Sequence, residues 1–345
     1  MKSIGEMDSL FQPSRFWSDL AAQNLRMLET NGVANFKRSV AQNYFNWAVE
    51  GPSDPQMRAL LAAWAADPSP LPLAADLRGS AALTGINGLA FLRNASAVRA
   101  YTLFVGLLWW YASRGDDAGI AARLSEPRVG NPVGIEIDGR PISQDLANAL
   151  REYSRLRPYL TPDDDAPRPV LAEIGAGYGR LGAAVLQAQP ARYWIFDIPP
   201  ALAIAEWYLS EVFTDRKVFR WRPFTSWSEV SAEAAEADIA LFTVDQLPMV
   251  PDGMVRCFAA ISALHEMRPE QIEAFMALMG RKSTRALYTK NWSHWRNEAD
   301  AFDFSSDLLV PSSGWDKAFD RADDVLLSFT EKLFVRRGGS EVLTR

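Results

Sequence analysis

The chain has 345 residues, 48% of them hydrophobic, so it can bury a sizeable core and is too long for one doubly wound domain alone. Its formal charge of −6, without a dense stripe of lysine and arginine, argues against nucleic acid as a partner. The single cysteine, Cys257, excludes an internal disulfide, and its apolar surroundings predict a buried thiol in a cytoplasmic protein.

Nothing in the first residues predicts a secretory signal, because residues 1–16 are interrupted by charges. The longest apolar run, residues 103–111, is well short of the roughly 20 residues that span a bilayer. We therefore expect a buried helix there and no membrane as a partner.

The first half of the chain predicts a mostly helical domain over residues 1–160. Apolar residues recur at spacings of three and four in the segments 14–31, 40–50, 56–66 and 97–114. A short hairpin at 130–140, turning at Asp138 and Gly139, precedes a helix at 143–156. The acidic, proline-containing residues 161–169 predict a linker. Its three aspartates fit a solvated loop better than a metal site, so no metal is expected.

Residues 170–180, with the sequence VLAEIGAGYGR, begin the second predicted domain, 170–345. They predict a buried parallel strand, a glycine turn and a helix that starts near Gly179; a second strand then ends at Asp197. Glycines allow a sharp turn and close approach to a ligand, and a helix start offers free N–H groups. Asp197 would accept hydrogen bonds from ribose hydroxyls. The pattern predicts a nucleoside-cofactor site, with an ordinary tight turn as the alternative.

Two registers of the glycines are possible. A dinucleotide fingerprint starts at Gly177 and ends at Gly182, but its strand would have to run through Gly175. The register that begins at Glu173 and Gly175 lets the strand stop naturally, and it resembles the motif of class I S-adenosylmethionine-dependent methyltransferases. In that family the strand-end acid and the glycine loop hold the methionine part of the cofactor.

Two further apolar strands are predicted at 239–244 and 255–264. Between them, the turn DQLP at 245–248 resembles the acid-x-Leu-Pro turn that contacts adenine in many methyltransferases of this class. Asp245 would then accept from the exocyclic amine, and Gln246 would offer its backbone N–H to the ring. Alternatively, Asp245 only ends a strand and the prolines shape a loop.

His265, one of two histidines, follows the predicted strand 255–264, and open α/β sheets place their chemistry at such carboxyl ends. Methyl transfer to a hydroxyl benefits from a base with a pKa near neutrality. His265 is the first candidate, and Glu266 would orient the imidazole or be the base itself. A histidine that only fixes a strand-to-helix corner is the alternative.

In combination, several segments resemble a bacterial family of sugar O-methyltransferases. The similar segments are 173–180, 197–203, 264–267 and 288–292, and upstream 35–39 with 43–45 and 130–132 with 143–146. The resemblance implies S-adenosylmethionine as cofactor and a hydroxyl of a sugar or glycosylated natural product as acceptor. The implied cofactor contacts are Glu173, Gly175, Ala176, Gly177, Tyr178, Gly179, Asp197, Ile198, Asp245, Gln246 and Ser262. By the same resemblance, Arg38 and Tyr44 contact the acceptor.

The segment 292–296 follows a predicted strand at 286–289 and would lie at the cofactor edge of the sheet. An aromatic platform at Trp292 would stack on a sugar face or enclose a flat or cationic acceptor, with a packing contact as the alternative. Lys290 and His294 are further candidates for contacts with the polar groups of the acceptor.

Near the end of the chain, strands predicted at 325–330, 333–337 and 342–344 are too close together to be parallel. An antiparallel edge hairpin closes the sheet in methyltransferases of this class, and a plain dinucleotide fold does not require it. The predicted fold is thus a doubly wound Rossmann-like α/β sheet with an antiparallel C-terminal edge strand, preceded by a helical domain.

Three other functions stay open on the sequence. The chain could methylate nitrogen or carbon of an aromatic or isoprenoid intermediate, act as a nicotinamide-dependent oxidoreductase, or sense the cofactor without turnover. The expected partner is a small molecule, and a homo-oligomer is compatible with the sequence.

Overall fold

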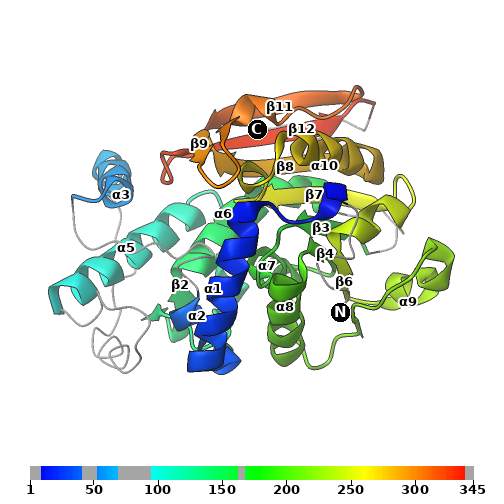
Figure 1. The fold of residues 1–345 in the computed structure, drawn as a ribbon. Coiled ribbons are helices and arrows are strands. Elements are labelled where there is room, and N and C mark those ends of the chain that lie inside the picture. Colours follow the sequence, from blue (N-terminus) through cyan, green and yellow to red (C-terminus); the bar gives the residue numbers. More distant parts are fainter. Residues whose placement is uncertain (1–8, 41–52, 69–94, 162–167, 339–345) are drawn as a thin grey trace. The chain divides into compact units, whose positions relative to one another are not determined.

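The computed structural model describes residues 9–40, 53–68, 95–161 and 168–338 (Figure 1). The expected helix at 40–50, Tyr44, most of the expected linker and its aspartates, and the strand at 342–344 therefore lie outside the described residues.

The described chain forms two compact units. One comprises the described residues within 9–21, 156–323 and 328–338, and the other comprises those within 22–155 and 324–327. This division differs from the expected boundaries at residues 160 and 170. The first residues of the chain group with the sheet, and a short segment near the end groups with the helices.

The first unit is built on one eight-stranded sheet. Its strands are β3 (Val170–Ile174), β4 (Arg192–Asp197), β5 (Val218–Phe219), β6 (Ile239–Thr243), β7 (Val255–Ile261), β8 (Ser283–Trp292), β11 (Trp315–Ala322) and β12 (Phe329–Arg336). Their order is β11-β12-β8-β7-β3-β4-β6-β5. The strands from β5 to β8 are parallel, whereas β12 runs antiparallel to both β8 and β11. The predicted α/β sheet with an antiparallel edge strand is confirmed.

The helices of this unit are α7 (Arg180–Ala188), α8 (Pro199–Val212), α9 (Ser231–Glu236) and α10 (Pro269–Lys282), and α1 (Arg15–Asn31) begins in it. All five residues of β3 are buried, as expected of a parallel strand covered on both faces. Alternate residues of the central strands, such as Trp194, Phe196 and Phe242, share a core with Phe275 of α10. A small hairpin, β9 (His294–Asn297) with β10 (Phe302–Ser305), follows β8 and was not predicted.

The C-terminal strands differ from the prediction. Residues 329–336 form the single strand β12, so the predicted break between 330 and 333 is wrong. Besides β8, β12 pairs with β11, which the hydrophobic pattern missed. Most residues of β11 are exposed and many are charged, as is common at the edge of a sheet, so no apolar alternation marks it.

The second unit is mostly helical, as predicted. It contains α2 (Phe36–Ser39), α3 (Pro55–Ala66), α5 (Ala95–Ser113), most of α1 and the greater part of α6 (Gln144–Leu160). The strands β1 (Gly134–Ile137) and β2 (Arg140–Ser143) form the predicted hairpin. Asp138 and Gly139 both have positive φ, 50° and 72°, as a two-residue hairpin turn requires. Within the described residues, no helix has the length and apolar character needed to cross a membrane.

Candidate functional site

The glycine loop follows β3 directly. Gly175, Gly177 and Gly179 all have positive φ, between 59° and 85°, which residues with a β-carbon rarely adopt. A β-carbon at Gly175 would also lie 2.5 Å from that of Ala263, which follows β7. Because β3 ends before Gly175 and α7 begins after Gly179, the loop has the register that begins at Glu173.

Asp197 at the end of β4 holds this loop. Its Oδ2 accepts the N–H of Gly177 at 2.9 Å, and its Oδ1 accepts the N–H of Ile198 at 2.7 Å. Only 4% of Asp197 is exposed. Burial raises its pKa to about 7, although the two N–H bonds favour the ionised form. Each oxygen keeps a lone pair with which it can accept from a ligand hydroxyl.

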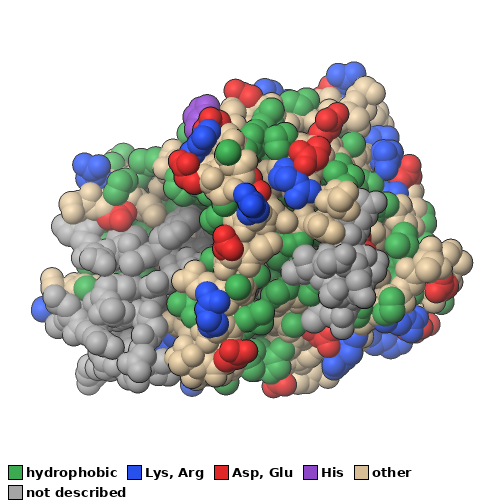
Figure 2. All heavy atoms as spheres, in the orientation of Figure 1, with side chains coloured by type: hydrophobic (Ala, Val, Ile, Leu, Met, Phe, Trp, Pro, Cys, Tyr) green, Lys and Arg blue, Asp and Glu red, His purple; other side chains and the backbone are tan. Residues whose placement is uncertain are grey.

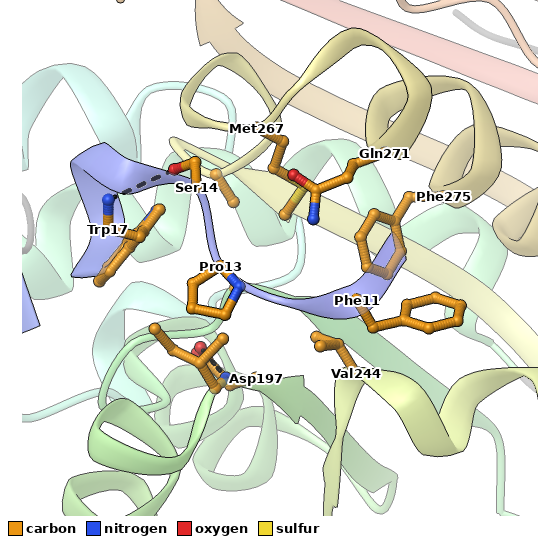
Figure 3. A pocket seen from close by; sticks show the side chains of 12 residues that line it. Phe11, Pro13, Ser14, Trp17, Asp197, Val244, Met267, Gln271 and Phe275 are labelled. Atoms are coloured by element: carbon orange, nitrogen blue, oxygen red, sulfur yellow. Dashed lines mark hydrogen bonds between the residues drawn. The ribbon is translucent and has the colours of Figure 1, made fainter. Parts of the chain in front are cut away.

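Asp197 lies at a pocket between the strand ends and the first residues of the chain (Figure 3). The empty space within the pocket is about 440 Å³, a volume that includes the part open to solvent. Its lining is mainly apolar and consists of Phe11, Pro13, Ser14, Trp17, Gly175, Asp197, Ile198, Val244, Ala263, Met267, Gln271 and Phe275. A single carboxylate in such surroundings can orient a ligand that is otherwise held by apolar contact.

The residues 9–17, which we call the N-terminal segment, form one side of this pocket. The Gln271 amide on α10 donates to the carbonyls of Leu10 and Gln12, each at 2.8 Å. The Phe11 ring packs edge-on against Phe275, with centroids 5.7 Å apart. Sequence reasoning placed this segment in the helical domain and missed its role, because no local motif marks a segment that is held by contacts far along the chain.

We expect Gln271→Leu to release the N-terminal segment. The substitution removes both amide bonds, and each carbonyl left unpaired in a partly buried place costs about 1–3 kcal/mol. Hydrogen exchange at residues 9–17 should therefore speed up roughly tenfold or more. Gln187→Leu is the matched control, because the Gln187 amide donates to the Ala183 carbonyl of its own helix. Unchanged exchange in Gln271→Leu would contradict this account of the segment.

Among the residues expected to contact a cofactor, three line the pocket: Gly175, Asp197 and Ile198. Glu173 is buried and accepts a hydrogen bond from the hydroxyl of Tyr193. The Tyr178 ring packs edge-on against Tyr208, 5.1 Å away.

Other residues that were expected to contact the cofactor shape the backbone of the glycine loop and of the turns at the strand ends. The Ala176 carbonyl accepts the N–H of Gly179. Ser262 adopts a positive φ of 53° directly before Ala263, and its N–H bonds to the Lys290 carbonyl. Ser262 thus shapes the turn that brings Ala263 to the pocket.

The turn after β6 departs from the expectation for Gln246. The backbone N–H of Gln246 donates to the side chain of Thr243, while its side chain accepts the N–H of Thr243 at 3.0 Å. The Gln246 amide also donates to the Arg222 carbonyl. This reciprocal cap engages the N–H that was expected to contact adenine, so that role is corrected. Val244, in the same turn, lines the pocket, whereas Asp245 does not.

His265 occupies a closed aromatic box. Its Nδ1 lies 3.2 Å from Oδ1 of Asn291, and the rings around it belong to Trp292, Trp295, Phe304 and Phe329. Burial lowers the pKa of His265 to about 4, against the effect of the bond to Asn291. The same Asn291 oxygen accepts the N–H groups of Ala263 and Leu264. The geometry favours the alternative that His265 fixes the corner after β7.

Glu266 fits the role of a base better than His265 does. Its carboxylate lies 3.5 Å from Nε2 of His265 and bonds to Trp17, a residue that lines the pocket. Burial raises its pKa well above the usual range; the bond to Trp17 opposes this rise, and Asp197 adds to it. Glu266 Oε2 is buried and has no hydrogen-bond partner within the described residues.

The residues that were expected to contact the acceptor lie in different surroundings. Lys290 is fully buried and pairs with Asp323 at 2.8 Å, which corrects its expected role as an open contact for the acceptor. Trp292 is half-buried against Phe329, and His294 is exposed at the start of β9. Arg38 belongs to the second unit, where its Nε donates to the carbonyl and side-chain oxygens of Asn131, both at 3.0 Å.

Figure 2 shows lysine, arginine, aspartate and glutamate side chains interspersed on the face in view, without a continuous basic stripe. This agrees with the balance of charge in the sequence.

No family model and no curated protein matches this sequence. Among solved structures, the chain is similar to magnesium protoporphyrin IX methyltransferase from Synechocystis PCC 6803 with bound SAH, at 14% identity over 56% of this chain and 85% of that one, with a TM-score of 0.39. It is also similar to the pyocyanin biosynthetic protein PhzM, at 15% identity over 82% of this chain and 73% of that one, with a TM-score of 0.33. Such distant likeness carries no argument about chemistry, so the function has to be inferred from the site itself.

Proposed function

We propose that the chain is an S-adenosylmethionine-dependent methyltransferase that methylates a hydroxyl of a small molecule, a sugar or a glycosylated natural product. The observation that carries the proposal is Asp197, whose buried carboxylate holds the glycine loop and lines a mainly apolar pocket. In the family that the sequence resembles, these positions hold the cofactor.

The described residues fit the nucleoside of this cofactor. Gly175 lets the loop lie close to Ala263, because a β-carbon there would clash with that residue, and the carboxylate of Asp197 suits the two ribose hydroxyls. The apolar side chains of Ile198, Val244 and Phe11 suit a flat base. The antiparallel β12 between β8 and β11 favours a methyltransferase over a nicotinamide-dependent oxidoreductase, since the dinucleotide fold does not require that strand.

When bound, the cofactor supplies an electrophilic methyl group, so the protein has to position the acceptor, exclude water and remove one proton. The N-terminal segment excludes water on one side of the pocket. Glu266 takes the proton in this proposal, because its carboxylate bonds to the pocket residue Trp17 and burial raises its pKa above the usual range, whereas burial lowers the pKa of His265 to about 4. His265 then acts as a positioning residue for Glu266.

Titration calorimetry with S-adenosylhomocysteine, beside NAD and NADP, tests the cofactor assignment. Micromolar binding of S-adenosylhomocysteine alone is the expected result. Binding of a nicotinamide cofactor instead would replace the proposal with an oxidoreductase. A screen of sugars, glycosides, amines and aromatic acceptors with labelled cofactor then separates O-methylation from methylation of nitrogen or carbon.

Glu266→Gln should lower kcat about 100-fold or more with the best acceptor of that screen, because a general base contributes roughly that factor. S-adenosylhomocysteine affinity should stay within a few-fold of the wild-type value. The matched control is Glu270→Gln, since Glu270 is exposed and bonds to Arg268. If Glu266→Gln keeps its kcat, Glu266 is not the base.

The pKa of Asp197 predicts opposite pH trends for stability and binding. The folded protein keeps the carboxyl proton of Asp197 up to about pH 7, whereas the unfolded chain releases that proton near pH 3.8. The contribution of Asp197 to stability is therefore full below 3.8 and is lost as the pH rises toward 7. Ribose hydroxyls prefer the carboxylate, so S-adenosylhomocysteine should bind roughly tenfold more tightly at about pH 8 than at about pH 6. Calorimetry on Asp197→Asn should show no such slope; an equal slope would assign it to another group.

A further inference from the structure

The helix α1 starts at the pocket, and its first N–H groups are capped from two places. Ser14 precedes the helix, and its hydroxyl accepts the N–H of Trp17 at 3.3 Å, as Figure 3 shows. Oδ1 of Asp300 accepts the N–H of Arg15 at 3.1 Å, and Oδ2 accepts the N–H of Phe16 at 3.4 Å. The first three N–H groups of the helix are therefore satisfied, which fixes where α1 begins.

Asp300 is itself held in the turn between β9 and β10. Its N–H donates to Oδ1 of Asn297 at 3.1 Å, and the Asn297 amide donates back to Oδ2 of Asp300 at 3.0 Å. Asn297 is fully buried, so this turn has a firm base. A residue 285 positions further along the chain than Arg15 thus sets the start of α1. Both ends of this contact belong to the first unit.

Trp17 belongs to the wall of the pocket and also contacts Glu266. It is half-buried, packs against the apolar core of the sheet and lines the pocket. The indole has one polar group, an N–H that can only donate a hydrogen bond. The bond between the side chains of Trp17 and Glu266 therefore runs from this N–H to the carboxylate. One side chain of the N-terminal segment thus joins the pocket to the proposed base.

A second series of contacts joins the same segment to Glu266. The Phe16 ring packs edge-on against Trp295, with centroids 5.0 Å apart, and Trp295 packs edge-on against His265 at 5.3 Å. Nε2 of His265 lies 3.5 Å from Oε1 of Glu266. Two successive residues of the segment, Phe16 and Trp17, therefore support one carboxylate, the first through two rings and the second directly.

The other oxygen of this carboxylate is left over. Oε2 of Glu266 is buried, and no hydrogen-bond partner for it lies in the described part of the chain. A buried acceptor without a partner is costly in free energy, so its presence calls for an explanation other than stability. A carboxylate that is held in place while one oxygen stays open to a hydroxyl is what general-base catalysis requires.

We propose that Trp17 is a positioning residue for Glu266 and that Asp300 sets the place of Trp17 by capping α1. The indole N–H fixes the carboxylate, and Oε2 is left to accept the proton of the acceptor hydroxyl. That Glu266 takes this proton rests on the proposed function. Because Trp17 also lines the pocket, displacement of the N-terminal segment would remove the pocket wall and release the base at the same time.

Carbon-13 NMR of the side-chain carboxyl groups, in the full chain without ligand, tests this contact. The Glu266 signal is the one missing from Glu266→Gln. Burial raises the pKa of Glu266, the Trp17 bond lowers it and Asp197 raises it, while His265 lies beside the carboxylate. Trp17→Phe keeps an aromatic ring but removes the N–H, so Glu266 should titrate at a higher pH than in the wild type. Asp300→Ala should move the titration in the same direction by less.

The matched controls change the same residue types at places without these contacts. Trp227→Phe alters another half-buried tryptophan that packs against the same core. Asp303→Ala alters an exposed acid of the same hairpin, which pairs with Arg296. Neither control should move the Glu266 titration. An unchanged Glu266 titration in Trp17→Phe would overturn the proposal.

Turnover with the best acceptor gives a second measurement. Trp17→Phe should lower kcat about tenfold near pH 7, because one hydrogen bond to a charged group has about that effect on its ionised fraction. The loss should shrink as the pH rises and Glu266 ionises again. A loss of equal size at every pH would mean that Trp17 only fills space.

A titration with S-adenosylhomocysteine distinguishes a failure of this role from a failure of the proposed function. If the Glu266 titration moves in Trp17→Phe but the wild type does not bind S-adenosylhomocysteine, the contact stays and the proposed function falls. If S-adenosylhomocysteine binds and Glu266 titrates alike in both proteins, the proposed function stays and the positioning role of Trp17 falls.

Discussion

Asp197→Ala should weaken S-adenosylhomocysteine binding about 100-fold or more, because hydrogen bonds to a charged group contribute about 1.5–3 kcal/mol each. The variant loses the acceptor for the ribose hydroxyls. It also frees the N–H groups of Gly177 and Ile198, so the glycine loop loses the contact that holds it against β4. Titration calorimetry at a pH above 7, where Asp197 is ionised, measures the full effect.

Asp238→Ala is the matched control for this substitution. Asp238 is also mostly buried and accepts the N–H of Lys217 at 2.9 Å, and it pairs with Arg168. It precedes β6, whereas Asp197 ends β4, so the two acids lie at opposite ends of a parallel sheet. Asp238→Ala should lower stability and leave the affinity unchanged. Equal losses of affinity in both variants would mean that the effect is a general loss of folding.

Gly182→Ala should destabilise the protein by about 2–4 kcal/mol, which combines overpacking with the loss of a buried hydrogen bond. A β-carbon at Gly182 of α7 would lie 2.1 Å from the Tyr193 ring. Tyr193 is itself buried and bonds through its hydroxyl to Glu173 on the neighbouring strand β3, so the ring cannot move without breaking that bond. Urea unfolding followed by circular dichroism measures the change.

Gly115→Ala is the control for the same chemical change. A β-carbon at Gly115 meets no atom within 4 Å, so this variant should be neutral or more stable by about 0.4–1 kcal/mol through the unfolded state. Gly182→Ala with wild-type stability would show that α7 can shift away from β4. The close packing of helix on strand would then not be the reason for a glycine there.

Local patterns in the sequence were sufficient to predict the elements that depend only on neighbouring residues. The buried strand at β3, the glycine turn after it and the start of α7 at Arg180 follow from neighbouring residues, as does the hairpin turn at Asp138 and Gly139. The sequence predicted that an antiparallel strand closes the edge of the sheet, but it did not predict which residues form that strand. The exposed strand β11 has no apolar periodicity by which to find it.

Which groups of the site are open and which are closed was decided by contacts between residues far apart in the chain. Lys290 and His294 looked alike as polar residues near a strand end, yet one is buried against Asp323 and the other is exposed. The pattern around His265 suggested a base, but the aromatic rings that enclose it come from β8, β9, β10 and β12.

The sequence by itself determined the central parallel strands of the sheet, the register of the glycine loop and the acid at its edge, because these depend on hydrophobic period and backbone freedom over a few residues. Only the tertiary structure decided that residues 9–17 form one side of the pocket. The physical reason is that burial, and with it the pKa and the hydrogen-bonding capacity of a side chain, is set by partners hundreds of residues away, such as Gln271 for Leu10.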